Sequence, residues 1–192
     1  VWRKTALRLS FESFAAPTFI GREASDLVVA EGDGKLHYFR NVKGDFHTWE
    51  EVPGYFGQRI ITGLACSPAI AEIGDESIMV VGNINGELKL FRRAPSAEGL
   101  PWKEEEGFFT GIKLSGFSRG VLTVWDGRYL LIAGQQNGIL QAYLNTGGDE
   151  RPHWVEQKGF FAGLPSLYHA APSVFDLDGD GRWELVVGDA DG

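Results

Sequence analysis

A unit of about 52 residues recurs through the chain and constrains its fold more than any single motif. A complete unit has a short apolar run, an Asx-Gly dipeptide, a second apolar run, a Trp and a Gly-aromatic-Phe triplet, and the first three units are complete. The dipeptides are Asp33-Gly34, Asn85-Gly86, Asn137-Gly138 and Asp191-Gly192, and the later markers are Trp49 with Gly54-Tyr55-Phe56, Trp102 with Gly107-Phe108-Phe109 and Trp154 with Gly159-Phe160-Phe161. Because markers of different chemistry stay in register, the sequence predicts one continuous array of units.

Each unit is predicted to contain four short antiparallel strands. The run before each dipeptide is short and rich in β-branched residues, which is typical of a buried strand. The dipeptide itself favours a type I′ hairpin turn, and the returning strand alternates apolar and polar residues. A third strand surrounds each Trp, and one more precedes the hairpin, opening at Pro17, Pro68, Gly120 and Pro172. The predicted fold class is therefore all-β: a β-propeller of four-stranded antiparallel blades, with about three and a half to four blades in this chain.

Residues 1–192 are predicted to form a single propeller domain or a propeller fragment. The units span approximately 14–65, 66–117, 118–169 and 170–192, and residues 1–13 form an outer strand of a neighbouring or closing blade. The last unit stops at its own Asx-Gly dipeptide. This favours a piece of a larger propeller, with further blades in a parent chain or another copy; a four-bladed ring closed by residues 1–8 is the alternative.

Composition excludes several classes of protein. The net charge of −8 argues against a protein that tracks nucleic-acid phosphates, which needs a clustered basic face. No stretch approaches the roughly 20 apolar residues of a membrane helix. Cys66 is the single cysteine, so no intrachain disulfide can form, and its small apolar neighbours predict a buried side chain.

The fourth unit carries the pattern of a cation site. Asp176, Asp178 and Asp180 alternate, so a turning chain can point them inward at one ion, as oxygen-binding cations require. The Arg182 backbone carbonyl and the Glu184 carboxylate would complete the shell. The alternative is a solvated acidic turn whose side chains cap their own backbone. We expect one structural Ca²⁺, since the equivalent segments of the other three units lack the alternating acids.

The segment 172–188 resembles the FG-GAP/VCBS-like repeats of integrin-type β-propellers. It reads Pro-x-x-x-Asp-x-Asp-Gly-Asp-Gly-x-x-Glu-Leu-Val-Val-Gly, although the literal FG-GAP tripeptides are missing and Gly-Phe-Phe takes a comparable place. The resemblance implies a propeller of several blades with structural Ca²⁺ in blade loops, held here by Asp176, Asp178, Asp180 and Glu184. It also implies a secreted, periplasmic or cell-surface location. It implies no particular ligand.

The aromatic residues divide into predicted core and candidate ligand contacts. Those at fixed repeat positions are expected to pack between blades: Trp49, Trp102, Trp154, Phe108, Phe109, Phe160 and Phe161. Those without a counterpart in every unit are candidates for ligand binding: Trp125, Tyr129, Tyr168 and Trp183. Arg92-Arg93 is expected at a solvated hairpin end. A second cation site at Glu104-Glu105-Glu106 is a weaker alternative.

No catalytic residues are visible in the sequence. The four histidines show no close metal-ligand spacing, and no G-x-S-x-G elbow is present. We therefore expect a calcium-stabilised extracytoplasmic propeller that serves as a binding or scaffold module for a protein or glycan ligand. A lectin-like propeller and part of a polysaccharide-degrading enzyme are the two alternatives, because fold does not settle function.

Overall fold

The protein is an all-β chain of antiparallel sheets. A computed structural model describes residues 11, 14–20, 26–44, 48–56, 63–93, 102–165, 167–176 and 182–190. Three sheets have four strands each and the last has two, and every sheet follows the order of the sequence. Across these residues, no helix is long and apolar enough to cross a membrane.

The strands match the four elements predicted for each unit. The first sheet contains β1 (Ala16–Ile20), β2 (Asp26–Ala30), β3 (Leu36–Asn41) and β4 (Trp49–Glu51). The second contains β5 (Ser67–Ile73), β6 (Glu76–Gly82), β7 (Leu88–Arg93) and β8 (Lys103–Glu104). The third contains β9 (Arg119–Trp125), β10 (Arg128–Gly134), β11 (Gln141–Asn145) and β12 (Trp154–Glu156), and the fourth contains β13 (Ala171–Phe175) and β14 (Glu184–Gly188).

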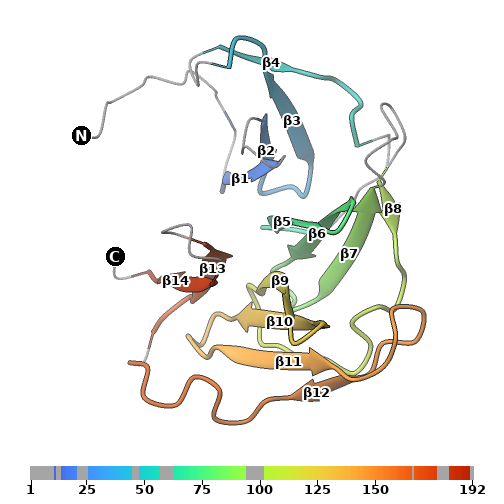
Figure 1. The fold of residues 1–192 in the computed structure, drawn as a ribbon. Helices are drawn as coiled ribbons and strands as arrows, with labels where there is room; N and C mark the ends of the chain where they lie inside the picture. The colour runs from blue at the N-terminus through green and yellow to red at the C-terminus, as the bar shows by residue number, and fades with distance from the viewer. Residues whose placement is uncertain are drawn as a thin grey trace.

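The sheets follow one another around a common centre. In Figure 1 the first strands β1, β5, β9 and β13 lie innermost, and the last strands β4, β8 and β12 lie at the periphery. The innermost strands contact one another in sequence, β1 with β5, β5 with β9 and β9 with β13. The prediction of an all-β chain of four-stranded antiparallel units is thus confirmed for the first three units.

The second strands of the second and third sheets end in continuous apolar runs because neighbouring sheets cover both of their faces there. Residues 78–82 of β6 and 130–134 of β10 are buried without alternation. In β14, which lacks a third strand beside it in the described chain, the same kind of run is only half covered, and Val186 is exposed. The β-branched runs in the sequence therefore reflect strands that are buried on both faces, between two neighbouring sheets.

The hairpin turns differ from the prediction. A type I′ turn requires positive φ at both central residues, but Asp33, Asn85 and Asn137 are not among the residues with positive φ, whereas the following glycines are. In the second sheet, Gly86 donates its N–H to the Asn83 carbonyl, and Asn83 donates to the Glu87 carbonyl. This is a three-residue loop that ends in a left-handed glycine, so the type I′ expectation was wrong.

A second left-handed position recurs just before each innermost strand. Phe14, Ala65, Phe117 and His169 all have φ between 45° and 55°. Ala65 donates its N–H to the Gly32 carbonyl (2.9 Å), Phe117 to Ile84 (3.0 Å) and His169 to Gln136 (3.2 Å). The turn amides of Ile84, Gln136 and Ala190 donate to carbonyls of the connecting segments that lead into their own sheets, at Leu64, Gly116 and Tyr168. Each connecting segment is thus bonded to the turn of the sheet before it and to the turn of the sheet after it. These bonds, which we call the seams, join each sheet to the next.

The peripheral ends of the sheets are joined by aromatic and guanidinium contacts. Arg92 donates to Glu76 (2.9 Å) and to the Tyr129 hydroxyl of the third sheet, and lies over the Phe108 ring. Arg93 bonds the Tyr55 hydroxyl and lies 4.9 Å from the centre of its ring. The expectation that Arg92-Arg93 is a solvated hairpin end was wrong, because both guanidinium groups bridge adjacent sheets.

Most of the predicted core aromatics pack as expected. Trp102, Phe108 and Phe109 are buried, and Trp49, Trp154 and Phe161 are partly buried against core residues. Phe160 is the exception, with 41% of its surface exposed. The prediction failed there because the described fourth sheet has no outer strands to cover it. Cys66 is buried, as predicted.

The seams predict a difference between two glycines. Gly138 and Gly127 both have positive φ, so alanine at either position costs about 1–2 kcal/mol of strain. A Cβ at Gly138 would lie 1.6 Å from the Leu167 carbonyl oxygen, whereas at Gly127 it would meet nothing within 4 Å. Gly138→Ala should therefore lose a further ~1–3 kcal/mol of unfolding free energy in urea titrations. Equal losses of unfolding free energy for the two variants would contradict this prediction, because they would show that the backbone at Leu167 moves aside without cost.

Candidate functional site

The four innermost strands line a cavity that is open to solvent. It has a volume of about 570 Å³. Its lining includes Phe19 from β1, residues 70–73 of β5, residues 121–124 of β9, Val174 from β13 and Trp183 just before β14. Every sheet contributes to it, so the cavity exists only because the sheets are arranged around a centre.

The cavity wall is mainly apolar and carries two accessible aromatic rings. Phe19 is 50% exposed and Trp183 is 61% exposed, and the neighbouring Val124 is also exposed. The lining has two polar side chains, Thr123 and Glu72, and the Glu72 carboxylate accepts hydrogen bonds from the Ser77 hydroxyl. Exposed aromatic rings around an apolar hollow are suited to holding an apolar or aromatic group of a ligand.

The predicted cation loop lies between β13 and β14. The register pairs Phe175 with Glu184, so the first and last acidic residues of the motif, Asp176 and Glu184, stand at the two ends of one hairpin loop. Arg182 also lies in the described chain, whereas Asp178 and Asp180 lie outside the described residues. Within the described ranges, no cluster of three or more potential metal ligands is present.

The equivalent hairpins of the second and third sheets are much shorter. Ile73 pairs with Glu76, and Trp125 pairs with Arg128, so each loop contains only two residues. The fourth unit has eight residues, 176–183, at this point, and three of the acidic residues of the predicted cation motif occur among them.

The four ligand-binding candidates lie in different places. Trp183 lines the central cavity. Trp125, which is 57% exposed, stands at the end of β9 with the Phe160 ring packed edge-on at 5.6 Å. Tyr129 is held between sheets by Arg92, and Tyr168 packs edge-on against His169 at 4.5 Å. The structure therefore brings one of the four into the cavity, and gives Tyr129 a packing role.

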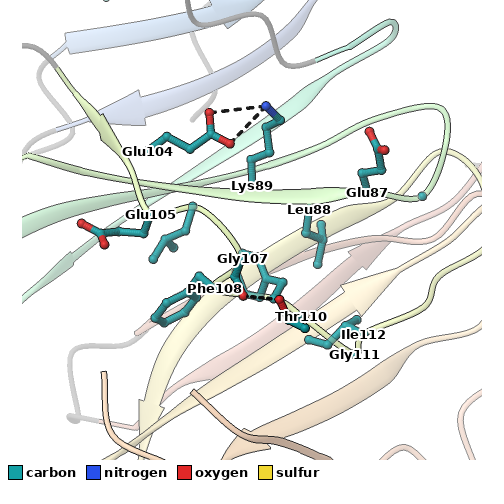
Figure 2. A pocket seen from close by; sticks show the side chains of 13 residues that line it. Glu87, Leu88, Lys89, Glu104, Glu105, Gly107, Phe108, Thr110, Gly111 and Ile112 are labelled. Carbon is teal, nitrogen blue, oxygen red and sulfur yellow. Dashed lines mark hydrogen bonds and ion pairs between the residues drawn. The ribbon is translucent and has the colours of Figure 1, made fainter. Parts of the chain in front are cut away.

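A second hollow, of about 400 Å³, lies along the second sheet beside residues 107–112 (Figure 2). Its charged residues are already paired: Lys89 with Glu104 at 3.1 Å, Glu105 with Lys103 at 3.5 Å, and Glu87 with the Asn83 amide at 2.7 Å. The Glu104-Glu105-Glu106 run thus has two of its carboxylates engaged by lysines. These contacts give the weaker alternative of a second cation site no support.

His37 has the most distinctive polar surroundings of the described histidines. Its Nδ1 lies 2.8 Å from Glu51, and its Nε2 lies 3.1 Å from Glu31. Burial lowers the pKa of His37, but the hydrogen bonds to the two carboxylates outweigh this and raise it above the ordinary value of 6.5. Both ring nitrogens are engaged, so this arrangement indicates a stabilising ion pair. His153 bonds the Thr146 hydroxyl, and His47 lies outside the described residues.

The sequence predicted a ligand-contact role for Trp183, which stays a prediction, but did not predict the cavity that Trp183 lines. Phe19, Thr123 and Val124 were assigned to inner strands without a role in a site. The available signal was the recurrence of an inner strand in every unit, since strands of that kind converge where sheets surround an axis. Which side chains face the hollow depends on the tilt of each strand, and a repeat period does not reveal this.

The His37 ion pair predicts a pH-dependent contribution to stability. Because the folded-state pKa is raised, the contribution is fully present below the unfolded-state pKa of about 6.5 and is lost as pH rises through the folded-state value. His37→Gln should therefore lower the unfolding free energy more at about pH 5.5 than at about pH 9. His153→Gln serves as the control in the same urea titrations. An equal loss for His37→Gln at both pH values would contradict this assignment.

Comparisons with known proteins add no relative from which a function could be transferred. No protein-family model matches the chain, and searches of curated proteins and of solved structures also return no match. The cavity and the acidic loop are therefore the observations from which a function can be argued.

Proposed function

We propose that this chain is a β-propeller-type binding module that holds its ligand at the centre of the ring of sheets. The proposal is supported by three sheets with the same strand order and by four innermost strands that surround one hollow. The single observation that carries it is the central cavity, whose wall presents the exposed rings of Phe19 and Trp183. Accessible apolar surface gathered in a concave site is typical of a ligand site.

The chemistry of the wall favours a protein ligand. A sugar ring can stack on an indole, but its hydroxyls also require several polar partners at the site. Among its side chains, the described wall offers Thr123 and Glu72 for that purpose, against nine apolar ones: Phe19, Ile70, Ala71, Ile73, Val121, Leu122, Val124, Val174 and Trp183. An aromatic or aliphatic side chain of a partner protein suits this lining better. A lectin-like function is the second candidate, and the exposed Trp183 indole is the observation that favours it.

Calcium is proposed to act structurally, through the loop that carries the cavity's indole. Trp183 lies between Arg182 and Glu184, two of the proposed calcium-binding residues. Ca²⁺ bound by Asp176, Asp178, Asp180, the Arg182 carbonyl and Glu184 would neutralise the carboxylates and order the loop. On this proposal the protein works outside the cytoplasm, as the propellers that it resembles do. The ion takes no part in chemistry and serves to hold Trp183 in place.

Two tryptophans of similar exposure allow the binding site to be tested. Trp183 and Trp125 are 61% and 57% exposed, but only Trp183 is among the residues that line the cavity. Peptides selected from a display library on the intact protein should lose at least about tenfold in affinity with Trp183→Ala, the loss expected for an aromatic contact at a binding site. Trp125→Ala should leave the affinity unchanged.

Two outcomes of this binding experiment would count against the proposal. Equal loss with both variants would place the ligand elsewhere. A glycan array that yields ligands sensitive to Trp183→Ala, with no peptide selected, would support the lectin-like candidate instead.

Removal of calcium should destabilise the fold and weaken the site together. At a calcium concentration a hundredfold above the dissociation constant, binding to the folded state contributes about 2.7 kcal/mol. EDTA should therefore lower the thermal midpoint, and added Ca²⁺ should restore it. Asp180→Asn should abolish the response to calcium, whereas Asp126→Asn, in a two-residue turn of the third sheet, should keep it. An unchanged midpoint in EDTA, with no calcium uptake by calorimetry, would refute the calcium assignment.

A further inference from the structure

Another hollow adjoins the central cavity on the third sheet. It has a volume of about 360 Å³ and is lined by residues 127–129 of the β9–β10 hairpin, and by Asn145 and residues 147–149 where β11 leads into its loop to β12. Ile73 and Val124 line both this hollow and the central cavity. The two hollows therefore meet at these side chains, and an elongated ligand can occupy both. We call the hollow on the third sheet the outer subsite.

The outer subsite contains a buried amide with an unused donor. Asn145 is 2% exposed, and its Oδ1 accepts the N–H groups of Gly147 (3.0 Å) and His153 (2.9 Å). These two bonds fix which way the amide faces. Its Nδ2, which is not fully enclosed, has no acceptor in the part of the chain that the structure describes. Because a buried donor without an acceptor costs free energy, an occupant that brings an acceptor is favoured here.

Two charged side chains of opposite sign belong to the same lining. Arg128 follows the two-residue turn after β9, and Asp149 lies in the loop between β11 and β12; both are exposed. Neither side chain has a hydrogen bond or an ion pair with the residues that the structure describes. The guanidinium group offers donors and the carboxylate offers acceptors. An anion would be repelled by Asp149 and a cation by Arg128, so the subsite suits a neutral group that has both a donor and an acceptor.

The loop between β11 and β12 is held in place by its own hydrogen bonds. The N–H of Thr146 donates to the His153 carbonyl at 2.8 Å. A Cβ at Gly147 would lie 2.1 Å from the Arg151 carbonyl oxygen, so the loop closes this tightly only with glycine at that position. The outer subsite is therefore largely formed in advance, as ligand sites usually are.

We propose that the ligand of the central cavity is an extended peptide segment that continues into the outer subsite. An apolar side chain of the segment occupies the cavity beside Trp183, and the main chain then crosses to the third sheet. In the subsite, Asn145 and Arg128 donate to a main-chain carbonyl, and Asp149 accepts a main-chain N–H. This inference rests on the proposed binding function and adds to it the class of ligand and the direction in which the ligand runs.

Peptide chemistry matches both hollows. Each peptide unit carries one N–H and one C=O, which are the groups that the subsite can bond. Successive side chains of an extended segment point to opposite sides, so a side chain can enter the cavity while the main chain beside it stays open to hydrogen bonds. A saccharide also suits the polar subsite, but its hydroxyl groups would lose their water against the apolar wall of the central cavity.

The variant Asn145→Asp removes the donor and keeps the acceptor that fixes the loop. The aspartate can still accept the N–H groups of Gly147 and His153, and thermal midpoints report whether the fold is kept. Linear peptides are selected from a display library on the intact protein, and their affinities are measured by calorimetry. Asn145→Asp and Arg128→Gln should each weaken binding about three- to tenfold, the loss expected for one hydrogen bond. Arg151→Gln, an exposed arginine of the same loop outside the subsite, should leave the affinity unchanged.

The outcomes separate this inference from the function on which it rests. Loss of affinity with Trp183→Ala, but with neither Asn145→Asp nor Arg128→Gln, would overturn the inference and leave the cavity as the binding site. No loss with any of the three would overturn both. Loss with the subsite variants alone would also overturn the inference, because the peptide would then avoid the cavity. Glycans that bind with sensitivity to Asn145→Asp, with no peptide selected, would overturn the assignment of a peptide.

A second measurement avoids the buried position altogether. Each amide of a selected peptide is methylated in turn, which removes one N–H donor at a time. Methylation at one position should weaken binding to the wild-type protein several-fold and have little further effect on Asp149→Ala, since the two changes remove the same hydrogen bond. Additive losses at every position would overturn the role of Asp149 and the proposed course of the peptide.

Discussion

The fold depends on one backbone arrangement, the seam between successive sheets. A left-handed glycine ends each hairpin turn, and a left-handed residue in the following connection bonds back to that turn. At Gly34, Gly86 and Gly138 the connecting backbone approaches so closely that no Cβ fits. Because both partners are main chain, the seam repeats with the same geometry wherever the chain supplies the two left-handed positions. It brings the innermost strands together and so creates the central cavity.

Side-chain contacts join neighbouring sheets at the periphery, as the seams join them near the centre. Arg92 and Arg93 reach the phenol groups of Tyr129 and Tyr55, and the Trp154 indole bonds the carbonyl of Phe108. These contacts have a buried apolar side and a polar end, so they exclude water while satisfying their donors. The proposed binding function depends on the inner strands instead, where the rings of Phe19 and Trp183 remain exposed in the cavity.

The sequence predicted the repeating parts of the structure well. The apolar runs and the Asx-Gly dipeptides predicted all four strands of each complete unit. Strand burial and the turns both leave patterns in short stretches of sequence, so they can be recognised without knowledge of the neighbouring sheets. It missed the left-handed positions at Phe14, Ala65, Phe117 and His169, since these residues share a backbone conformation and no side-chain chemistry. It misplaced Phe160 and Arg92-Arg93, whose surroundings depend on the neighbouring sheet. The calcium loop stays a prediction, because Asp178 and Asp180 lie outside the described residues.

The central claim is that the seams hold the sheets in one cooperative array around the cavity. Native-state amide hydrogen exchange tests it most directly, because it reports the opening free energy of individual backbone bonds. The amides of Ala65, Phe117 and His169 lie in connecting segments, yet each is bonded across a seam. The account predicts that they exchange as slowly as amides within β6 and β10. Exchange at the rate of free loops, with the strands still protected, would show that the sheets are joined loosely and would contradict it.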